Sequence, residues 1–284
     1  MFAPNFTMPF AYQGSIGLQR QLGTTMAFEA DYAYTGTRDY PRDVPMNLSF
    51  NPATGANYPF SDISKRPFPD WGFVSMSFNG ARSNRHALQT AFTKRFRGGW
   101  QASANYTLAG FWDAYPPPRS GFDLVTFPTA PDFSGEYSLA ISDQRHRAVL
   151  NGLWQLPYGV QLSGLYFYGS GQRFETRWGT DVRQIGSTVS TIHEQLLRPN
   201  GTLIPRNNFV GRPLHRVDLR LQRRFPLGGR AAIDGILEVY NVFNHTNYGS
   251  YSRTEDSKNY TQPSQNANVA YAPRMLQLGF RFAF

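Results

Sequence analysis

Hydrophobic and polar residues alternate at the end of the chain, over residues 274–284. Leu276, Leu278, Phe280, Phe282 and Phe284 occupy every second position, and mixed residues stand between them. Because successive side chains of a strand point to opposite faces, this pattern predicts a strand with one fully apolar, aromatic face. Such a row at the edge of a soluble sheet would invite aggregation, whereas a strand that faces lipid requires it. The pattern favours a membrane-spanning strand, and a soluble sandwich strand is the alternative.

The same alternation recurs along the chain in segments of roughly ten residues, the length that a tilted strand needs to cross a bilayer. Short and long connections alternate between these segments, as in outer-membrane barrels with short periplasmic turns and long extracellular loops. The sequence therefore predicts an all-β fold. We expect the chain to form a portion of an antiparallel transmembrane β-barrel, with about nine strands arranged as a meander. The segments are residues 12–22, 25–36, 84–96, 100–110, 145–156, 160–169, 214–225, 231–243 and 274–284; the long connections are 37–83, 111–144, 170–213 and 244–273.

The order of the connections predicts the direction of every strand. The loop before the last segment is long and therefore external, so counting back places the start of the chain outside as well. Residues 71–79 also alternate, and we assign them to a β-excursion within the first external loop. Nine strands is an odd number, single-chain bacterial barrels are even, and the first residues do not resemble a signal peptide. We therefore expect residues 1–284 to be the C-terminal part of a larger barrel.

Composition narrows the class further. The mean hydropathy is -0.45, and no apolar stretch approaches the length of a membrane helix, which excludes a helical membrane protein. The chain has no cysteine, which excludes disulfides, thiol catalysis and cysteine-based zinc sites. The net charge is +9, but the basic residues stand at strand ends and turns rather than in one stripe. That distribution is typical of barrel rims, so we expect no nucleic-acid partner.

Three motifs carry a resemblance to a known family. They are Asp143-Gln-Arg-His-Arg147, Asn84-Arg-His-Ala-Leu-Gln89 and Asn241-Val-Phe-Asn244. Together they resemble the C-terminal barrel of TonB-dependent outer-membrane receptors. The first two are more particular to the Oar-like branch, which carries a carboxypeptidase-regulatory-like domain. The resemblance covers essentially the whole chain.

This resemblance implies localisation in the bacterial outer membrane and uptake or surface binding of a solute in a full-length parent. Such receptors have a plug and a TonB box, which this chain lacks, so contact with the TonB complex would come only through the missing N-terminal part. The terminal strand is similar to the signature that the barrel-assembly machinery reads, and outer-membrane lipid and lipopolysaccharide are the other expected partners. The residues of this assembly signal are Leu276, Leu278, Phe280, Phe282 and Phe284.

Two groups of residues are candidates for contact with a solute. Charged residues alternate on the face opposite the apolar one, and we expect Arg220 to lie near Asp234 across the turn at residues 226–230. They form either a salt-bridge ladder along the lumen wall or a contact surface for plug or solute. Aromatic residues of the external loops either grip a ligand or pack the loops together. The lumen-wall candidates are Glu29, Asp31, Asp218, Arg220, Asp234, Glu238 and Tyr240, and the loop candidates are Trp71, Trp112, Tyr115 and Trp178.

The sequence gives little indication of a catalytic site. Omptin-like proteolysis needs paired carboxylates and an Asp–His couple, and the chain has neither an Asp-Asp nor an Asp-His dipeptide. The histidines are scattered without metal-ligand spacing, so we expect no catalytic residue, no metal and no cofactor. Two functions besides uptake remain: a stand-alone small outer-membrane barrel with an adhesion or structural role, and a soluble glycan-binding β-module.

Overall fold

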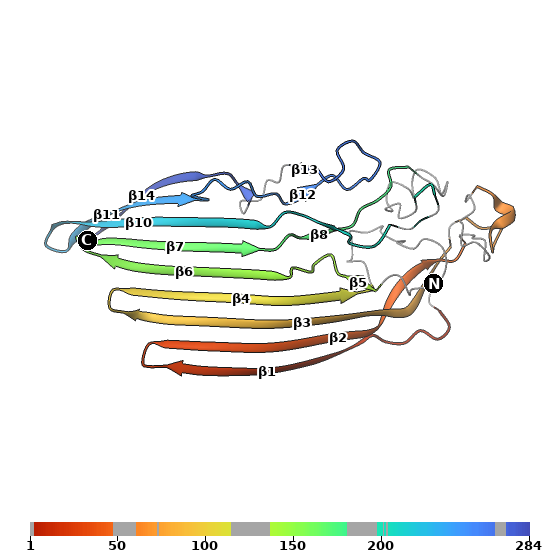
Figure 1. Cartoon of the computed structure of the whole chain (residues 1–284), viewed down its shortest axis with the longest axis horizontal. Coiled ribbons are helices and arrows are strands. Elements are labelled where there is room, and N and C mark those ends of the chain that lie inside the picture. Colours follow the sequence, from red (N-terminus) through yellow and green to blue (C-terminus); the bar gives the residue numbers. More distant parts are fainter. Residues whose placement is uncertain are drawn as a thin grey trace.

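The computed structural model describes residues 3–47, 61–72, 74–114, 137–180, 198–200, 202, 204–264 and 271–284. One antiparallel sheet dominates it, with nine long strands each paired to the next along the chain (Figure 1). The predicted all-β meander is confirmed. The long strands are β1 (Phe10–Leu22), β2 (Met26–Pro45), β3 (Ser75–Arg97), β4 (Trp100–Asp113), β6 (His146–Leu156), β7 (Val160–Gly169), β10 (Leu214–Gly228), β11 (Ala231–Tyr240) and β14 (Met275–Ala283).

Shorter elements lie in the long connections. β5 (Ser138–Leu139) pairs with the end of β4, and the only described helix is the 3-10 turn η1 (Ile63–Lys65). Two small hairpins form from β8 (Arg173–Phe174) with β9 (Phe209–Val210), and from β12 (Ser250–Tyr251) with β13 (Pro263–Ser264). In the part of the chain that the structure describes, no helix is long and apolar enough to cross a membrane.

The short turns lie at one end of the sheet, and the strand ends that lead into the long connections lie at the other (Figure 1). The turn between β3 and β4 needs two residues at positive φ, and Gly98 (66°) and Gly99 (85°) provide them without a Cβ clash. The C-terminus lies at the short-turn end and the N-terminus at the other. The predicted alternation of connections is confirmed.

The pairing of β2 with β3 is longer than predicted. β2 continues to Pro45 and β3 begins at Ser75, so residues 75–79 extend β3 rather than forming a separate excursion. The sequence did not predict this extension because the segment contains prolines and charged residues. Proline has no backbone N–H to donate to the hydrogen-bond ladder of a central strand. Beyond the pair Phe10–Arg38, however, β3 is the only strand that pairs with β2 among the described residues, and a shift of register around Tyr40 precedes the pair Pro41–Asn79. A strand with one free edge tolerates proline.

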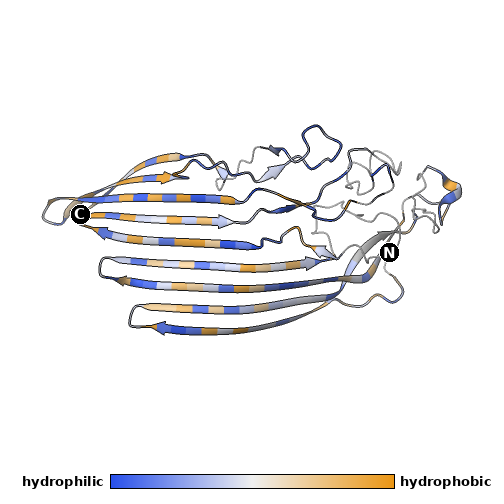
Figure 2. Cartoon of the chain, viewed as in Figure 1, coloured by the Kyte–Doolittle hydropathy of each residue, from blue (hydrophilic) through white to orange (hydrophobic). Residues whose placement is uncertain are grey.

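The pairing register joins the apolar positions of all nine strands into one face and the polar positions into the other. Figure 2 shows the alternation of hydrophobic and hydrophilic residues along each strand. We call these the apolar face and the polar face. Pairs on the apolar face include Ile16–Tyr32, Leu88–Leu108, Leu162–Leu221 and Leu237–Leu278; pairs on the polar face include Gln19–Glu29, Asp31–Gln89, Arg220–Glu238 and Glu238–Gln277.

Among the residues that the structure describes, the sheet has no conventional core, because the buried apolar residues are mostly alanines. The large apolar side chains are instead exposed, with Leu278 at 82% and Phe280 at 84%. Leu276, Leu278, Phe280 and Phe282 of the expected assembly signal lie on this apolar face, and the ring of Phe284, just past the end of β14, lies 5.9 Å from that of Phe282. An exposed aromatic and aliphatic face is the surface that hydrocarbon requires of a barrel.

Candidate functional site

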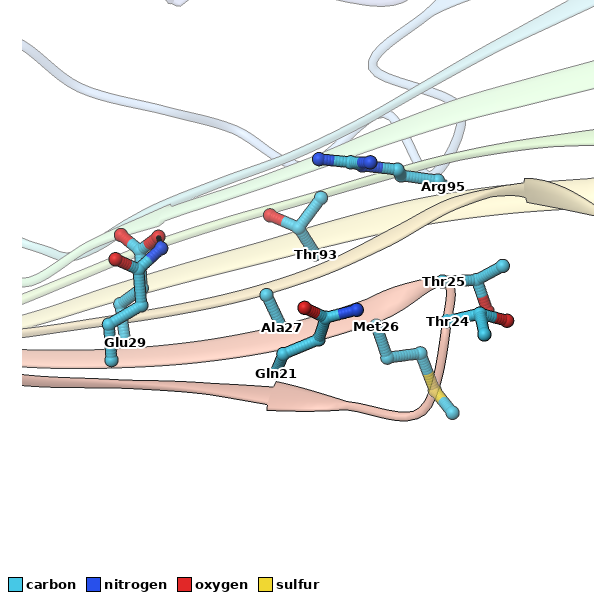
Figure 3. Close-up of a pocket in the computed structure, with 9 residues that line it drawn as sticks. Gln21, Thr24, Thr25, Met26, Ala27, Glu29, Thr93 and Arg95 are labelled. Atoms are coloured by element: carbon cyan, nitrogen blue, oxygen red, sulfur yellow. Dashed lines mark hydrogen bonds between the residues drawn. The ribbon is translucent and has the colours of Figure 1, made fainter.

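The polar face carries charged residues at the edge formed by β1 and β2. The Gln19 side-chain amide donates to Glu29 Oε1 at 2.7 Å, and Asp31 lies opposite Gly17. Close to the short turns, a polar hollow of about 450 Å³ is lined by Glu29, Gln21, Thr93 and Arg95 among others. Figure 3 shows Gln21, Glu29 and Thr93 pointing to one side of the sheet and Met26 to the other.

A second charged group lies on β10, β11 and β14, and it corrects the expected ion pair. Arg220 is directly opposite Glu238 and contacts it at 3.4 Å, whereas Asp234 lies opposite Arg224 and binds Arg281 at 2.6 Å. The expected pair of Arg220 with Asp234 is therefore wrong. The chain reverses within Gly229–Arg230 after a bulge at Gly228 (φ 112°), and this register separates Arg220 from Asp234 by four residues along the ladder.

The remaining lumen-wall candidates complete this second group. Asp218 binds Arg216 at 2.8 Å and accepts the backbone N–H of Asn241 at 2.9 Å. Tyr240 donates to Glu238 Oε2 at 3.2 Å. Glu238 and Tyr240 are thus hydrogen-bonded to each other, and Arg216, the partner of Asp218, lies 5.6 Å from the ring of Tyr240. Glu29 and Asp31 lie on β2, toward the other end of the strand order. Glu29, Asp218, Glu238 and Tyr240 thus have polar partners along the polar face, whereas Oδ1 of Asp234 is buried without a hydrogen-bond partner among the described residues.

Asp143 anchors the loops at the long-connection end. Its side chain is 2% exposed, accepts the backbone N–H of Phe111 at 2.9 Å and binds Arg173 at 3.2 Å. Asp143 therefore links the C-terminal end of β4 to the β8–β9 hairpin. A second buried pair, Arg206 with Asp113 at 3.0 Å, joins the same strand end to the connection before β10. Two buried, hydrogen-bonded ion pairs fix the position of these loops over the strand ends.

A cavity of about 360 Å³ lies between these loop bases and the ends of β7 and β10. Tyr251 packs against Phe174 with ring centroids 5.2 Å apart, and its hydroxyl accepts the backbone N–H of Arg212 at 2.8 Å. The exposed guanidinium of Arg212 lies 5.4 Å from the ring of Tyr248. The lining includes Asp143, Gln144, Phe167, Gln172, Phe174, Arg212, Tyr248, Tyr251 and Tyr271. Aromatic faces, amides and one cation together suit a ring-bearing, hydrogen-bonding solute.

A carboxylate stabilises the neighbouring β12–β13 loop. Glu255 binds Arg198 at 2.7 Å and accepts the hydroxyl of Thr176 at 3.0 Å. Burial by itself would raise the pKa of Glu255, but the hydrogen bonds from Arg198 and Thr176 outweigh burial and hold the pKa below its ordinary value of 4.5. The ionised form of Glu255 therefore holds these loop segments together.

The loop candidates from the sequence do not line this cavity. Trp71 is 67% exposed after η1, and Trp178 is half-buried beside the bridge between Arg177 and Thr254. Trp112, expected in a loop, is instead the penultimate residue of β4 and lies on the apolar face, because β4 continues to Asp113. Tyr115 lies outside the described residues.

Sequence reasoning missed Arg212, Tyr248, Tyr251 and Tyr271. The two tyrosines Tyr248 and Tyr251 follow directly after the Asn241–Asn244 motif, which was the available signal. Only the folding of two separate connections, β7–β10 and β11–β14, brings them together. Over the described ranges, no group of three or more His, Asp or Glu is arranged to hold a metal ion.

The comparisons with known proteins agree with this geometry. The family model described as an outer membrane beta barrel domain matches residues 1–277. The outer membrane transporter YddB from Escherichia coli is similar in structure, with a TM-score of 0.54 and 12% identity over 99% of this chain and 33% of that chain. The FrpB iron transporter from Neisseria meningitidis gives a TM-score of 0.50 and 15% identity over 100% of this chain and 32% of that chain.

At these identities the likeness concerns the fold alone. The chain spans about a third of the length of both transporters. A comparison with curated proteins finds no match.

Proposed function

The chain belongs to the outer membrane β-barrel family and lies in the bacterial outer membrane, and from this premise we propose that it forms part of a TonB-dependent uptake receptor. The solute binds in the cavity between the loop bases. Membership of this family excludes the alternative that the chain is a soluble glycan-binding β-module. The motifs Asp143–Arg147 and Asn84–Gln89 support the Oar-like branch within these receptors.

This proposal rests mainly on the cavity at the end of the polar face where the external loops begin. Its aromatic and amide lining lies where the external loops meet the strand ends, which is where a solute from outside first reaches the lumen side. Arg212 adds a cation for an anionic group. Binding followed by uptake, rather than catalysis, uses all of these features.

The open sheet and the third-length coverage support a place within a larger barrel. β1 and β14 stand at the two ends of the strand order, and neither has a second partner among the described residues. Unpaired backbone groups are costly in lipid, so both edges pair with further strands in the assembled receptor. TonB acts through another part of that receptor, and the assembly machinery reads the terminal strand.

Uptake by the cavity is tested in the cells that make the protein. Cells with wild-type protein, with Tyr248→Ala or with Trp71→Ala as a matched aromatic control grow in one defined extract, and mass spectrometry follows the depletion of its solutes. We expect at least one solute to be depleted by wild type and by Trp71→Ala but not by Tyr248→Ala, and a protonophore to abolish this depletion.

Equal depletion of every solute in all three strains would contradict the proposed binding site. Depletion that persists in the presence of the protonophore would contradict energised uptake and favour a small stand-alone barrel with an adhesion or structural role.

A further inference from the structure

The apolar face has an aromatic boundary at each end. Near the short turns, Trp100 lies directly opposite Trp154. Toward the long connections, three tyrosine hydroxyls hydrogen-bond histidine rings on other strands. These pairs are Tyr32–His86 at 2.7 Å, Tyr106–His146 at 2.8 Å and Tyr166–His215 at 3.2 Å. Tryptophan and tyrosine with a wet polar tip mark the two membrane–water interfaces, so the Tyr–His pairs mark the external one.

Three arginines lie just beyond this external boundary and on the same face. Gly36 and Gly110 are on the apolar face. A Cβ atom built on Gly36 would lie 3.3 Å from Arg38 Nη1, and a Cβ atom built on Gly110 would lie 3.1 Å from Arg145 Nη1. Both guanidinium groups therefore extend over the apolar side of the sheet. Arg82 lies 4.4 Å from the ring of Tyr137.

Aromatic and amide side chains join these arginines into one continuous patch. Asn84 accepts hydrogen bonds from Tyr34 at 2.8 Å and from Arg38 at 2.9 Å, and its amide donates to the hydroxyl of Tyr137. Trp112 is directly opposite Asn84, and its ring lies 5.5 Å from Arg145. We call Arg38, Arg82, Arg145, Tyr34, Trp112 and Tyr137 the rim patch.

The rim patch carries more positive charge than nearby carboxylates balance, because only Arg145 of its three arginines lies near one among the described residues. Arg38 is held by neutral acceptors, among them the carbonyl oxygens of Thr37 and Ser83 at 2.8 and 3.0 Å. Neither Arg38 nor Arg82 forms an ion pair with a described residue. Arg145 is 3.8 Å from Asp143, which lies closer to Arg173.

Arg82 is the most accessible member of the rim patch. It is exposed, and its contact with Tyr137 is to the ring face, so its guanidinium donors are free of any side-chain hydrogen bond to the described residues. A planar guanidinium presents a fork of donors that matches the oxygens of a phosphate group.

We propose that the rim patch binds the phosphate groups of a phosphorylated glycolipid in the outer leaflet, the lipid A part of lipopolysaccharide. Two guanidinium groups without a carboxylate partner among the described residues and a third, Arg145, that shares Asp143 with Arg173 lie at the height where headgroup phosphates lie, and they give the charge complementarity. The rings of Trp112 and Tyr137 offer apolar faces for the sugar units between those phosphates. The acyl chains then run along the apolar face below. This site requires only the outer-membrane location of the chain and is independent of the uptake proposal.

The binding is measured on the complete polypeptide purified from outer membranes in mild detergent. Native mass spectrometry counts bound lipid after addition of diphosphoryl lipid A, lipid A with its phosphates removed, or phosphatidylglycerol. We expect diphosphoryl lipid A to bind and the triple variant Arg38→Gln/Arg82→Gln/Arg145→Gln to lose about tenfold in affinity. Arg223→Gln is the matched control, since Arg223 lies over the ring of Phe225 at 5.0 Å on the apolar face near the short turns.

Three outcomes overturn the proposal: equal binding by the triple variant and wild type, equal loss in Arg223→Gln, or equal binding of lipid A without phosphates. Preference for phosphatidylglycerol would show a site for any anionic lipid instead. If the triple variant fails to fold, as judged by its heat-dependent mobility in gels, Arg82→Gln alone decides, because Arg82 makes no side-chain hydrogen bond to the described residues. We expect about threefold weaker binding for that single variant.

Discussion

At the scale of residues, two asparagines explain why the Asn241-Val-Phe-Asn244 motif ends a strand. Asn241 and Asn244 adopt φ values of 50° and 51°, in the left-handed region that asparagine tolerates better than most residues. The buried Asn241 side chain donates to the carbonyl oxygens of His245 at 2.9 Å and Ala272 at 3.1 Å. It therefore joins the end of β11 to the approach of β14. The motif is visible in the sequence, but its role as a clamp is not.

Replacing Asn241 with alanine removes these hydrogen bonds and forces alanine into a left-handed conformation. We expect Asn241→Ala to lower the free energy of unfolding by about 2–4 kcal/mol, since buried carbonyl groups lose their donors. Urea denaturation in detergent measures the change. Asn105→Ala, at an exposed position of the polar face, is the control and should change stability little. A loss in Asn241→Ala no larger than in the control would refute the clamp.

Glu255 makes the β12–β13 loop sensitive to acid. Its folded-state pKa lies below the ordinary value of 4.5, so its stabilising contribution is present above that pH and is lost as the pH falls below it toward the folded pKa. The protection factors of residues 250–264 against hydrogen exchange, which are corrected for the intrinsic pH dependence of exchange, should therefore fall in acid in the wild type. In Glu255→Gln the loop should exchange faster already at neutral pH and lose most of its acid response.

Glu29→Gln, a substitution on the polar face far from this loop, is the control variant for the acid response of the loop. Glu29→Gln should keep the wild-type profile. Protection factors in the wild type that stay constant as the pH falls from neutral to strongly acidic values would show that ionised Glu255 does not hold the loop.

At the scale of elements, face and register follow different rules. Alternation assigned each strand its apolar face, and the structure agrees for all nine. The pairing of Arg220 with Glu238 instead of Asp234 depended on how tightly Gly228 and Gly229 turn, which alternation does not encode. The extension of β2 through Pro41 was hidden in the same way, because a free edge tolerates a residue that a central strand excludes.

The two faces of β14 predict opposite responses to a buried charge. Leu278 lies on the apolar face and Gln277 on the polar face of the same strand. We expect Leu278→Lys to destabilise the folded protein in lipid by about 2–4 kcal/mol, as for a cation near the bilayer midplane, and Gln277→Lys to have little effect. Folding equilibria in lipid vesicles measure both. Equal costs for the two variants would contradict the assigned faces.

At the scale of the whole molecule, an open sheet of nine strands in lipid requires partners for its two edges. β1 and β14 each present one row of backbone groups without a strand beside it in the described part of the structure. We expect a denaturing immunoblot of outer membranes to show this chain within a polypeptide several-fold heavier than 32.1 kDa, in keeping with the third-length match to the transporters.

A band at 32.1 kDa would contradict that expectation. Cysteine cross-linking between Gln13 on β1 and Arg281 on β14 would then show whether two copies, or one closed copy, pair these edges. Either result would favour the small stand-alone barrel.

The sequence by itself determined the strands, their faces, the alternation of short and long connections and the outer-membrane class. These features are local, because a strand in lipid must show one apolar side chain at every second position. Only the tertiary structure decided which charges pair, which tyrosines line the cavity and which arginines form the rim patch. Asp143 and Arg173, or Arg38 and Asn84, meet through the register of several strands and the folding of long connections. Such distant contacts depend on geometry accumulated over many residues, and no local pattern records it.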